Sequence, residues 1–156
     1  MTTQVVTMIK KDEQVIDEFI EKMGLVFQAD GLPRIAGRIL AALIIYDEPF
    51  SFSQLSERLA VSRASVSTNT RLLAHLGMIE RSSKRGERQD YFQLKENPYT
   101  SFMQGIETRV AHAAEVIEQT RGQLAETSQS SEGAQQRLGQ MKTFYSSFLN
   151  AIKDLT

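Results

Sequence analysis

Apolar side chains recur at helical spacing near the start of the chain. Ile16, Ile20, Met23 and Phe27 stand four, three and four residues apart, which predicts an amphipathic helix over about 9–28. The other side of this segment carries the acidic side chains Asp12, Glu13, Asp17, Glu18 and Glu21. Acids near the beginning of a helix are favoured by its dipole, so the charge pattern agrees with the apolar one.

A second helix is predicted over 33–46. Pro33 suits the first helical position, because its missing N–H would have no helical partner there. Nearly every residue after Arg38 is apolar, and a helix that is apolar on most sides is normally buried. We therefore expect this helix to lie in the core.

The following stretch has the start and stop signals of two short helices. Residues 50–52 can pair as a minimal strand, and Ser53 is a suitable N-cap for a helix over 54–60. After a short turn, Ser62 offers a second N-cap, for a helix that runs to about Leu76. Two short helices joined by a tight turn are typical of a helix-turn-helix.

A β-hairpin is predicted next. Gly77 suits the left-handed conformation that ends a helix, 78–81 and 89–94 have strand composition, and 82–88 is a polar turn with one glycine. Adjacent strand residues point to opposite faces, so one member of the pair Tyr91–Phe92 is expected to pack inward. Helix, turn, helix and hairpin in this order predict a winged helix-turn-helix.

The C-terminal part of the chain is predicted to be two helices with apolar seams. The first runs from Pro98 to about Leu124, and a polar break over 126–133 separates it from the last helix. Its seam, with alternating spacings of three and four, is Met103, Ile106, Val110, Ala113, Ile117, Thr120 and Leu124. The seam of the last helix is Leu138, Met141, Tyr145, Phe148, Ile152 and Leu155. Seams of this kind pack against a partner helix.

Charge is distributed unevenly along the chain. The net charge is −1, which by itself argues against a nucleic-acid-binding protein. Between Ser51 and Lys95, however, eight basic and four acidic side chains give +4, so the remainder carries −5. A basic segment in an acidic protein indicates a localised phosphate-binding face.

The basic and hydroxyl side chains predict where that face lies. Val66 and Leu73 give the second short helix a buried side, and its other side carries no acid. Short hydroxyls can approach a groove closely and an arginine can bind guanine bidentately, so we expect double-stranded DNA to be the partner. The predicted DNA-binding residues are Ser62, Arg63, Ser65, Ser67, Thr68 and Arg71 on the helix, and Lys84, Arg85 and Arg88 on the hairpin. Asn69 lies nearer the buried side. The alternative for the polar side of the helix and for the hairpin tip is that these side chains are simply exposed to solvent and bind no partner.

The seams outside this segment predict a dimer. A helix over 98–124 is about 40 Å long at ~1.5 Å per residue, and a small winged-helix core cannot cover it. We expect a two-fold dimer with intertwined terminal helices; an antiparallel helix pair within one chain is the alternative. The predicted dimer contacts are Ile16, Ile20, Met23, Phe27, Met103, Ile106, Val110, Ile117, Leu138, Met141, Tyr145, Phe148 and Ile152.

The predicted fold class is mainly α with a small β-hairpin. An N-terminal dimerisation helix occupies 1–32, the winged helix-turn-helix occupies 33–96, and a helical dimerisation region occupies 97–156. Two recognition helices related by a two-fold axis, about one DNA turn (~34 Å) apart, would read a pseudo-palindromic operator.

Several segments of this sequence resemble the MarR superfamily, and within it the GbsR-like branch. The segments are 33–39, 49–56, 62–67, 76–79 and 86–92. The resemblance implies a dimeric winged-helix regulator, usually a repressor that a small ligand releases from DNA. It also implies that the recognition helix begins at Ser62 and that Arg88 is the wing arginine.

One part of the wing departs from the commoner MarR pattern. Where many members carry Asp-x-Arg, this chain reads Gly86-Glu87-Arg88, which is more similar to the GbsR-like branch. The usual Asp–Arg bracing of the wing is therefore missing from its normal position. Glu87 and Asp90 are the candidate replacements.

Other function classes find little support in the sequence. The chain has no cysteine, and His75 and His112 have no further ligands at metal-binding spacing, so we expect no metal and no cofactor. No catalytic motif is present, so an enzyme is not expected. The longest apolar run, 39–46, is far too short for a membrane span, and a cytoplasmic protein is expected. The competing hypothesis is a winged-helix adaptor that binds proteins without contacting DNA.

Overall fold

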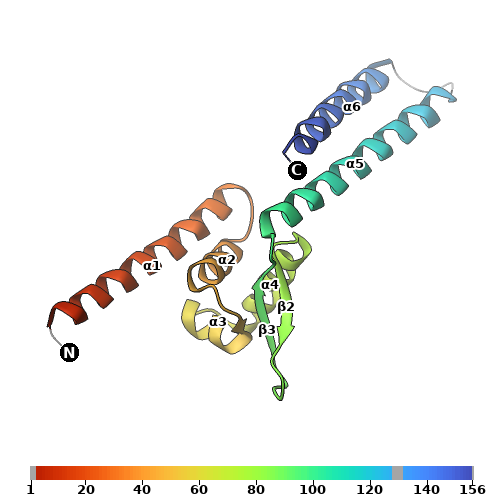
Figure 1. Ribbon diagram of the computed structural model, residues 1–156. Coiled ribbons are helices and arrows are strands. Elements are labelled where there is room, and N and C mark those ends of the chain that lie inside the picture. The colour runs from red at the N-terminus through yellow and green to blue at the C-terminus, as the bar shows by residue number, and fades with distance from the viewer. Residues whose placement is uncertain (1–2, 128–131, 156) are drawn as a thin grey trace. The chain divides into compact units, whose positions relative to one another are not determined.

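The computed structural model describes residues 3–127 and 132–155, with side chains from residue 12 onward. The chain forms two compact units, Met1–Pro98 and Tyr99–Thr156. The first holds four helices and a small antiparallel sheet, and the second is helical (Figure 1). The predicted fold class, mainly α with a β-hairpin in a winged helix-turn-helix, is confirmed.

Helices α1 (Thr3–Ala29) and α2 (Arg34–Tyr46) pack together in the first unit. Glycines allow the close approach: a Cβ on Gly37 would stand 2.5 Å from the Met23 carbonyl oxygen. Pro33 is the N-cap of α2 rather than its first residue, since its ψ of 130° is extended. Most of α2 is buried, as predicted.

Arginines connect α1 to the neighbouring helices. Glu21 of α1 accepts hydrogen bonds from Arg34 at 2.8 Å and from Arg38 at 2.7 Å, and Arg38 also donates to the Leu59 carbonyl. Arg58 donates to Asp17 at 2.6 Å. Burial raises the pKa of Glu21, but the hydrogen bonds and charges of the two arginines outweigh it and hold that pKa below its ordinary value. The first helix is thereby tied to the helix-turn-helix.

The first helix of the helix-turn-helix, α3 (Phe52–Leu59), begins earlier than predicted. Ser53 is not its N-cap; Ser51 is, because its backbone is still extended and its Oγ accepts the Gln54 N–H. The Gln54 side chain accepts the Ser51 N–H in return and completes a capping box. Strand β1 (Phe50–Ser51) therefore runs directly into the helix.

The second helix, α4 (Arg63–His75), agrees with the prediction. Ser62 is its N-cap, with the side chain accepting the Ser65 N–H at 3.1 Å. Gly77 follows with a φ of +81°, the predicted left-handed stop. Val66 and Leu73 are fully buried, whereas Leu76 is only half-buried.

Strands β2 (Ile79–Ser83) and β3 (Asp90–Leu94) form the predicted hairpin. Strand β1 pairs with the edge of β3 that faces away from β2, giving the order β1-β3-β2. Phe92 contacts Phe52 edge-to-face at 4.9 Å between ring centroids. Tyr91 is buried as well, so the expectation that only one of this pair packs inward is wrong. The Lys84 ammonium of the wing lies over its ring.

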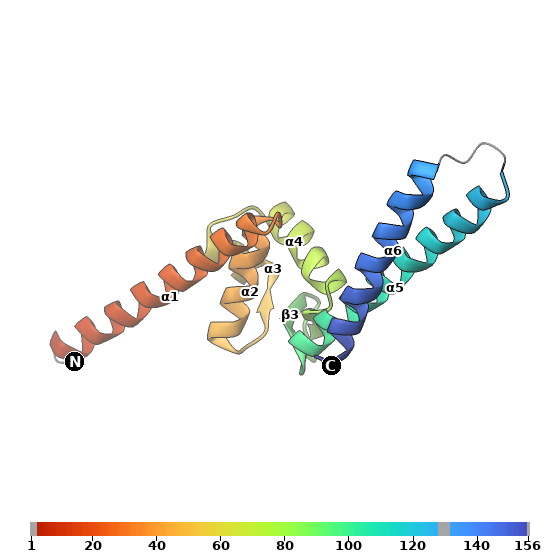
Figure 2. The same cartoon turned by 90° about the horizontal axis from the view of Figure 1, so that it is seen from above.

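The second unit consists of α5 and α6 (Glu132–Lys153), which lie antiparallel side by side (Figures 1 and 2). Helix α5 runs from Pro98 to Ala125, close to the prediction. Glu118 pairs with Lys142 at 2.7 Å, and the Arg121 carbonyl accepts a hydrogen bond from Gln135 at 3.1 Å. The predicted break is shorter than 126–133, because Glu132 and Gly133 are helical; 128–131 lie outside the described residues.

Candidate nucleic-acid interface

Helix α4 presents its basic residues outward. Arg63, Thr68 and Arg71 are exposed, and Ser65 and Ser67 are half-buried between them and the core. Arg63 and Arg71 are eight residues apart, which is about 12 Å along a helix. Among the described residues neither arginine forms an ion pair, and α4 contains no acid. Both guanidinium groups are therefore free to meet an external anion.

Local hydrogen bonds engage several polar groups at or near this face. The exposed Ser62 donates from its Oγ to the Ser65 Oγ at 2.9 Å. The Arg71 Nε makes a long contact of 3.4 Å with the Ser67 carbonyl, which leaves the rest of its guanidinium available. Asn69 is only 6% exposed and donates to the Ser65 carbonyl, so it lies toward the core as the sequence indicated.

The tip of the β2–β3 hairpin carries the remaining predicted cations. Lys84, Arg85 and Arg88 are all exposed, and Figure 1 shows the tip projecting from the helices of its unit. The turn is closed by the Glu87 N–H, which donates to the Lys84 carbonyl at 3.0 Å. Gly86 has a φ of +86° at the third position of this turn, where a type II turn requires a glycine-like conformation.

The wing is braced by different pairs from those of an Asp-x-Arg wing. Asp90 forms an ion pair with Arg81 across the hairpin, and Glu87 accepts a hydrogen bond from the Tyr91 hydroxyl. Neither acid pairs with Arg88. Both candidates for the missing aspartate are thus engaged, with partners that the sequence did not indicate.

Tyr91 is a residue of the wing whose contacts the sequence did not indicate. It is 4% exposed, and the Lys84 ammonium lies 4.2 Å from the centre of its ring. Its hydrogen bond to Glu87 lowers the pKa of that carboxyl and raises the pKa of the phenol. The sequence showed only that Tyr91 alternates with Phe92 along a strand. Its contacts with Lys84 and Glu87 depend on the conformation of the turn, which no local pattern predicts.

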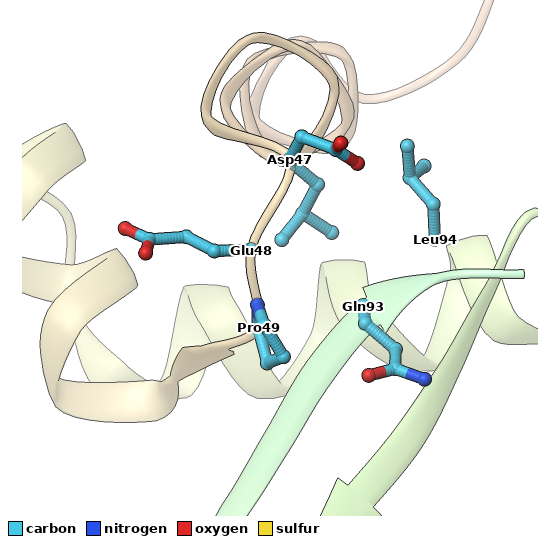
Figure 3. A pocket seen from close by; sticks show the side chains of 6 residues that line it. Asp47, Glu48, Pro49, Gln93 and Leu94 are labelled. Carbon is cyan, nitrogen blue, oxygen red and sulfur yellow. The ribbon is translucent and has the colours of Figure 1, made fainter.

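Two pockets lie near this region. One, of about 210 Å³, is bounded by α4, α3 and the sheet, and is lined by Phe52, Ser67, Thr70, Arg71, Ala74, Arg81 and Phe92. The other, of about 240 Å³, lies between the end of α2 and β3 (Figure 3). Figure 3 shows Glu48 directed away from Gln93 and Leu94 in that second pocket. Its carboxylates do not suit a phosphate, so it lies outside the candidate interface.

The histidines and acids form no further site in the described part of the chain. His75 is exposed at the end of α4, and His112 stands 4.0 Å from Glu115 with both side chains exposed. No group of three potential metal ligands occurs among the described residues, 3–127 and 132–155. Over the same residues, no helix is both long enough and apolar enough to cross a membrane.

The predicted dimer residues fall into two groups. Ile20 and Phe27 are 2% and 9% exposed in the single chain, while Ile16 and Met23 are half-buried. In the second unit Val110, Ile117 and Ile152 are buried, whereas Met103, Ile106, Leu138 and Tyr145 are half-buried. Met141 and Phe148 are exposed, together with Phe144 and Leu155.

Comparison with known proteins places this geometry in context. A sequence profile of the MarR family matches residues 30–89, which contain α2, α3, α4 and β2. The HTH-type transcriptional regulator MmpR5 of Mycobacterium tuberculosis is 34% identical over 143 residues, covering 91% of this chain and 85% of that protein. The HTH-type transcriptional repressor OpcR of Bacillus subtilis is 25% identical over 91 residues, 58% of this chain and 49% of its own length. A crystal structure of a transcriptional regulator superposes with a TM-score of 0.80 at 30% identity, covering 90% of this chain and 94% of that one.

Proposed function

Since this chain belongs to the MarR family and is a DNA-binding regulator of transcription, we propose that it is a homodimeric repressor that reads a pseudo-palindromic operator. One observation carries the proposal. The exposed face of α4 holds two arginines without acidic partners among the described residues, and the wing of the same unit carries three exposed cations. Such a surface suits a polyanion, and access to DNA requires a cytoplasmic location.

The proposed roles follow from the chemistry of each side chain. Helix α4 enters the major groove, where Arg63 and Arg71 bind guanine edges bidentately. Ser62, Ser65, Ser67 and Thr68 contact phosphates or base edges. The wing residues Lys84, Arg85 and Arg88 bind phosphates or enter the minor groove.

The dimer is proposed from apolar surface that the single chain leaves uncovered. On α6 the exposed side chains Met141, Phe144 and Phe148 lie at helical spacing, and Phe144 is 64% exposed. A contiguous aromatic surface on a helix normally has a partner. A second copy supplies an identical apolar surface, as a two-fold interface requires. Ile20 and Phe27 contribute mainly to the core of their own chain, so this proposal gives them little part in the contact.

Release by a small molecule is also part of the proposal. The pocket of about 210 Å³ beside α4 supports it, because Ser67 and Arg71 are both pocket-lining and proposed DNA-binding residues. An occupant there would compete with DNA for the same side chains.

Assignment to the GbsR-like branch is likewise proposed, supported by the sequence Gly86-Glu87-Arg88 in the wing.

The proposal is tested by selecting duplexes from a random DNA pool with the full-length protein. A mobility-shift titration then compares wild type with Lys84→Ala/Arg85→Ala/Arg88→Ala and with the control Lys22→Ala, an exposed cation on α1. We expect a single enriched palindrome, loss of affinity in the triple variant and none in the control. No enrichment, with all three proteins binding duplex equally weakly, would exclude DNA recognition and favour the adaptor hypothesis.

A further inference from the structure

Tyr91 contacts residues on both sides of the wing turn. Its hydroxyl donates to the Glu87 carboxylate and accepts a hydrogen bond from the Gln89 amide at 2.9 Å. The Lys84 ammonium lies over its ring at 4.2 Å from the centre, a distance at which a cation is attracted to the aromatic face. Lys84 and Glu87 are the first and last residues of the turn, so one buried side chain holds both ends.

Glu87 is the one acid of the segment 84–88 at the tip of the hairpin. A carboxylate placed among Lys84, Arg85 and Arg88 would repel DNA phosphates if it shared their outward direction. In the structure Glu87 is exposed, but its carboxylate accepts hydrogen bonds from two side chains of the hairpin, Tyr91 and, at 3.3 Å, Gln89. The hydrogen bond from Tyr91 is the main cause that lowers the pKa of Glu87, so the carboxyl group is ionised at neutral pH.

We propose that Tyr91 is a positioning residue for DNA binding, which holds the Glu87 carboxylate against the hairpin and away from the phosphates that Lys84, Arg85 and Arg88 would bind. The inference rests on the proposed DNA-binding function and extends it to a residue that does not contact DNA. Arg81 and Asp90 form a separate ion pair between the two strands of the hairpin. Tyr91 then determines the direction of the charge at the tip.

A double-mutant cycle isolates the contact. Tyr91→Phe keeps the ring and its packing but removes the hydroxyl, and Glu87→Gln removes the charge that the hydroxyl holds. Affinity is measured by fluorescence anisotropy on one duplex recovered by selection and on a scrambled duplex of equal length. We expect Tyr91→Phe to weaken both affinities about twofold to fivefold, the range of an exposed charged contact, and to have no effect in the Glu87→Gln background.

Two additional variants protect the test from a folding artefact. Glu87→Asp keeps the charge on an exposed residue but shortens the side chain, so it should weaken binding as Tyr91→Phe does. Tyr99→Phe, at an exposed tyrosine of the second unit, is the matched control and should bind as wild type. Carbon-13 NMR titration of the Glu87 carboxyl adds a readout that packing alone would not move: its pKa should rise in Tyr91→Phe.

The possible results distinguish a failure of the Tyr91 role from a failure of DNA binding itself. If wild type binds duplex DNA but Tyr91→Phe causes the same loss of affinity with or without the Glu87→Gln substitution, the contact does not act through the carboxylate and the inference is overturned. An unchanged affinity in both Tyr91→Phe and Glu87→Asp overturns it as well. If wild type binds no duplex, the proposed function itself fails, and the inference fails with it.

Discussion

The two units of this chain bury their apolar residues very differently. In the first unit, α2 alone buries seven of its 13 residues. In the second, α5 and α6, with 28 and 22 residues, bury only Val110, Ile117 and Ile152. The first unit also has capped helices and arginine contacts between α1, α2 and α3. Burial drives folding, so the first unit has the interior of an independent fold, whereas the second leaves apolar side chains exposed in the single chain.

The difference fits the two tasks that we propose for the units, DNA reading and dimerisation. A DNA-reading surface needs rigid support, because side chains must meet base edges with little loss of conformational entropy on binding. A dimerisation surface needs the opposite in the single chain, namely apolar side chains that remain exposed until the partner arrives. Variants in one unit should therefore change the property of that unit, which is stability and DNA binding for the first and association for the second.

The largest effect is expected from the interior of the first unit. Leu73 of α4 is 0% exposed, and Leu73→Ala should lower the free energy of unfolding by about 2–5 kcal/mol through lost burial and a residual cavity. Urea denaturation followed by circular dichroism measures the change. Leu25→Ala, at a half-exposed position of α1, is the control and should change stability little. Equal losses in both variants would contradict the described core.

A smaller effect is expected at the exposed apolar surface of the second unit. Phe148→Glu places a charge within the proposed dimer contact and should weaken association by about 2–4 kcal/mol, the scale of an interface hot spot. Sedimentation equilibrium measures it, with Ser146→Glu on the same helix as the control. The fold of the first unit should be unchanged. A wild-type monomer, or a Phe148→Glu protein that still dimerises fully, would contradict the proposal.

Next come the proposed base contacts of α4. Arg63→Ala or Arg71→Ala should weaken operator binding by about 1–3 kcal/mol and relax sequence preference, whereas Arg88→Ala should weaken binding to all sequences and reduce the salt slope by about one. Mobility-shift titrations at several salt concentrations distinguish the two patterns. Lys22→Ala is the control. If the three arginine variants bound like wild type, α4 and the wing would not be the reading surface.

The smallest effect concerns the arginine contacts of α1. Since the folded chain holds the pKa of Glu21 below its ordinary value of 4.5, the stabilisation is fully present above pH 4.5 and is lost as the pH falls through the lower folded value. The carboxylate is 43% exposed, so solvent screening limits the contribution to about 1 kcal/mol or less. Glu21→Gln should lower stability at pH 7 and flatten its decrease below pH 4.5. Glu57→Gln, an exposed acid outside the ion pairs of the described residues, should not.

Local signals were sufficient where one residue or one turn decides the structure. Ser62 caps α4, Gly77 ends it and Gly86 makes the wing turn, because each requirement concerns backbone groups only a few residues apart. The helical periods likewise predicted α2, α4 and α5 to within a residue or two. The exposed cations Arg63 and Arg71 could be predicted in the same way, since they lie opposite the apolar positions of α4.

Contacts between distant segments were decided only by the tertiary structure. Ser51 rather than Ser53 caps α3 because β1 pairs with β3, which keeps Ser51 extended next to Phe52. Tyr91 contacts both ends of the wing turn, because its hydroxyl donates to Glu87 and the Lys84 ammonium lies over its ring. The seam of α6 divides into the buried Ile152 and the exposed Phe148, a division that its helical period does not predict. A sequence period states which residues share a face, but what covers that face depends on segments far along the chain, or on a second chain.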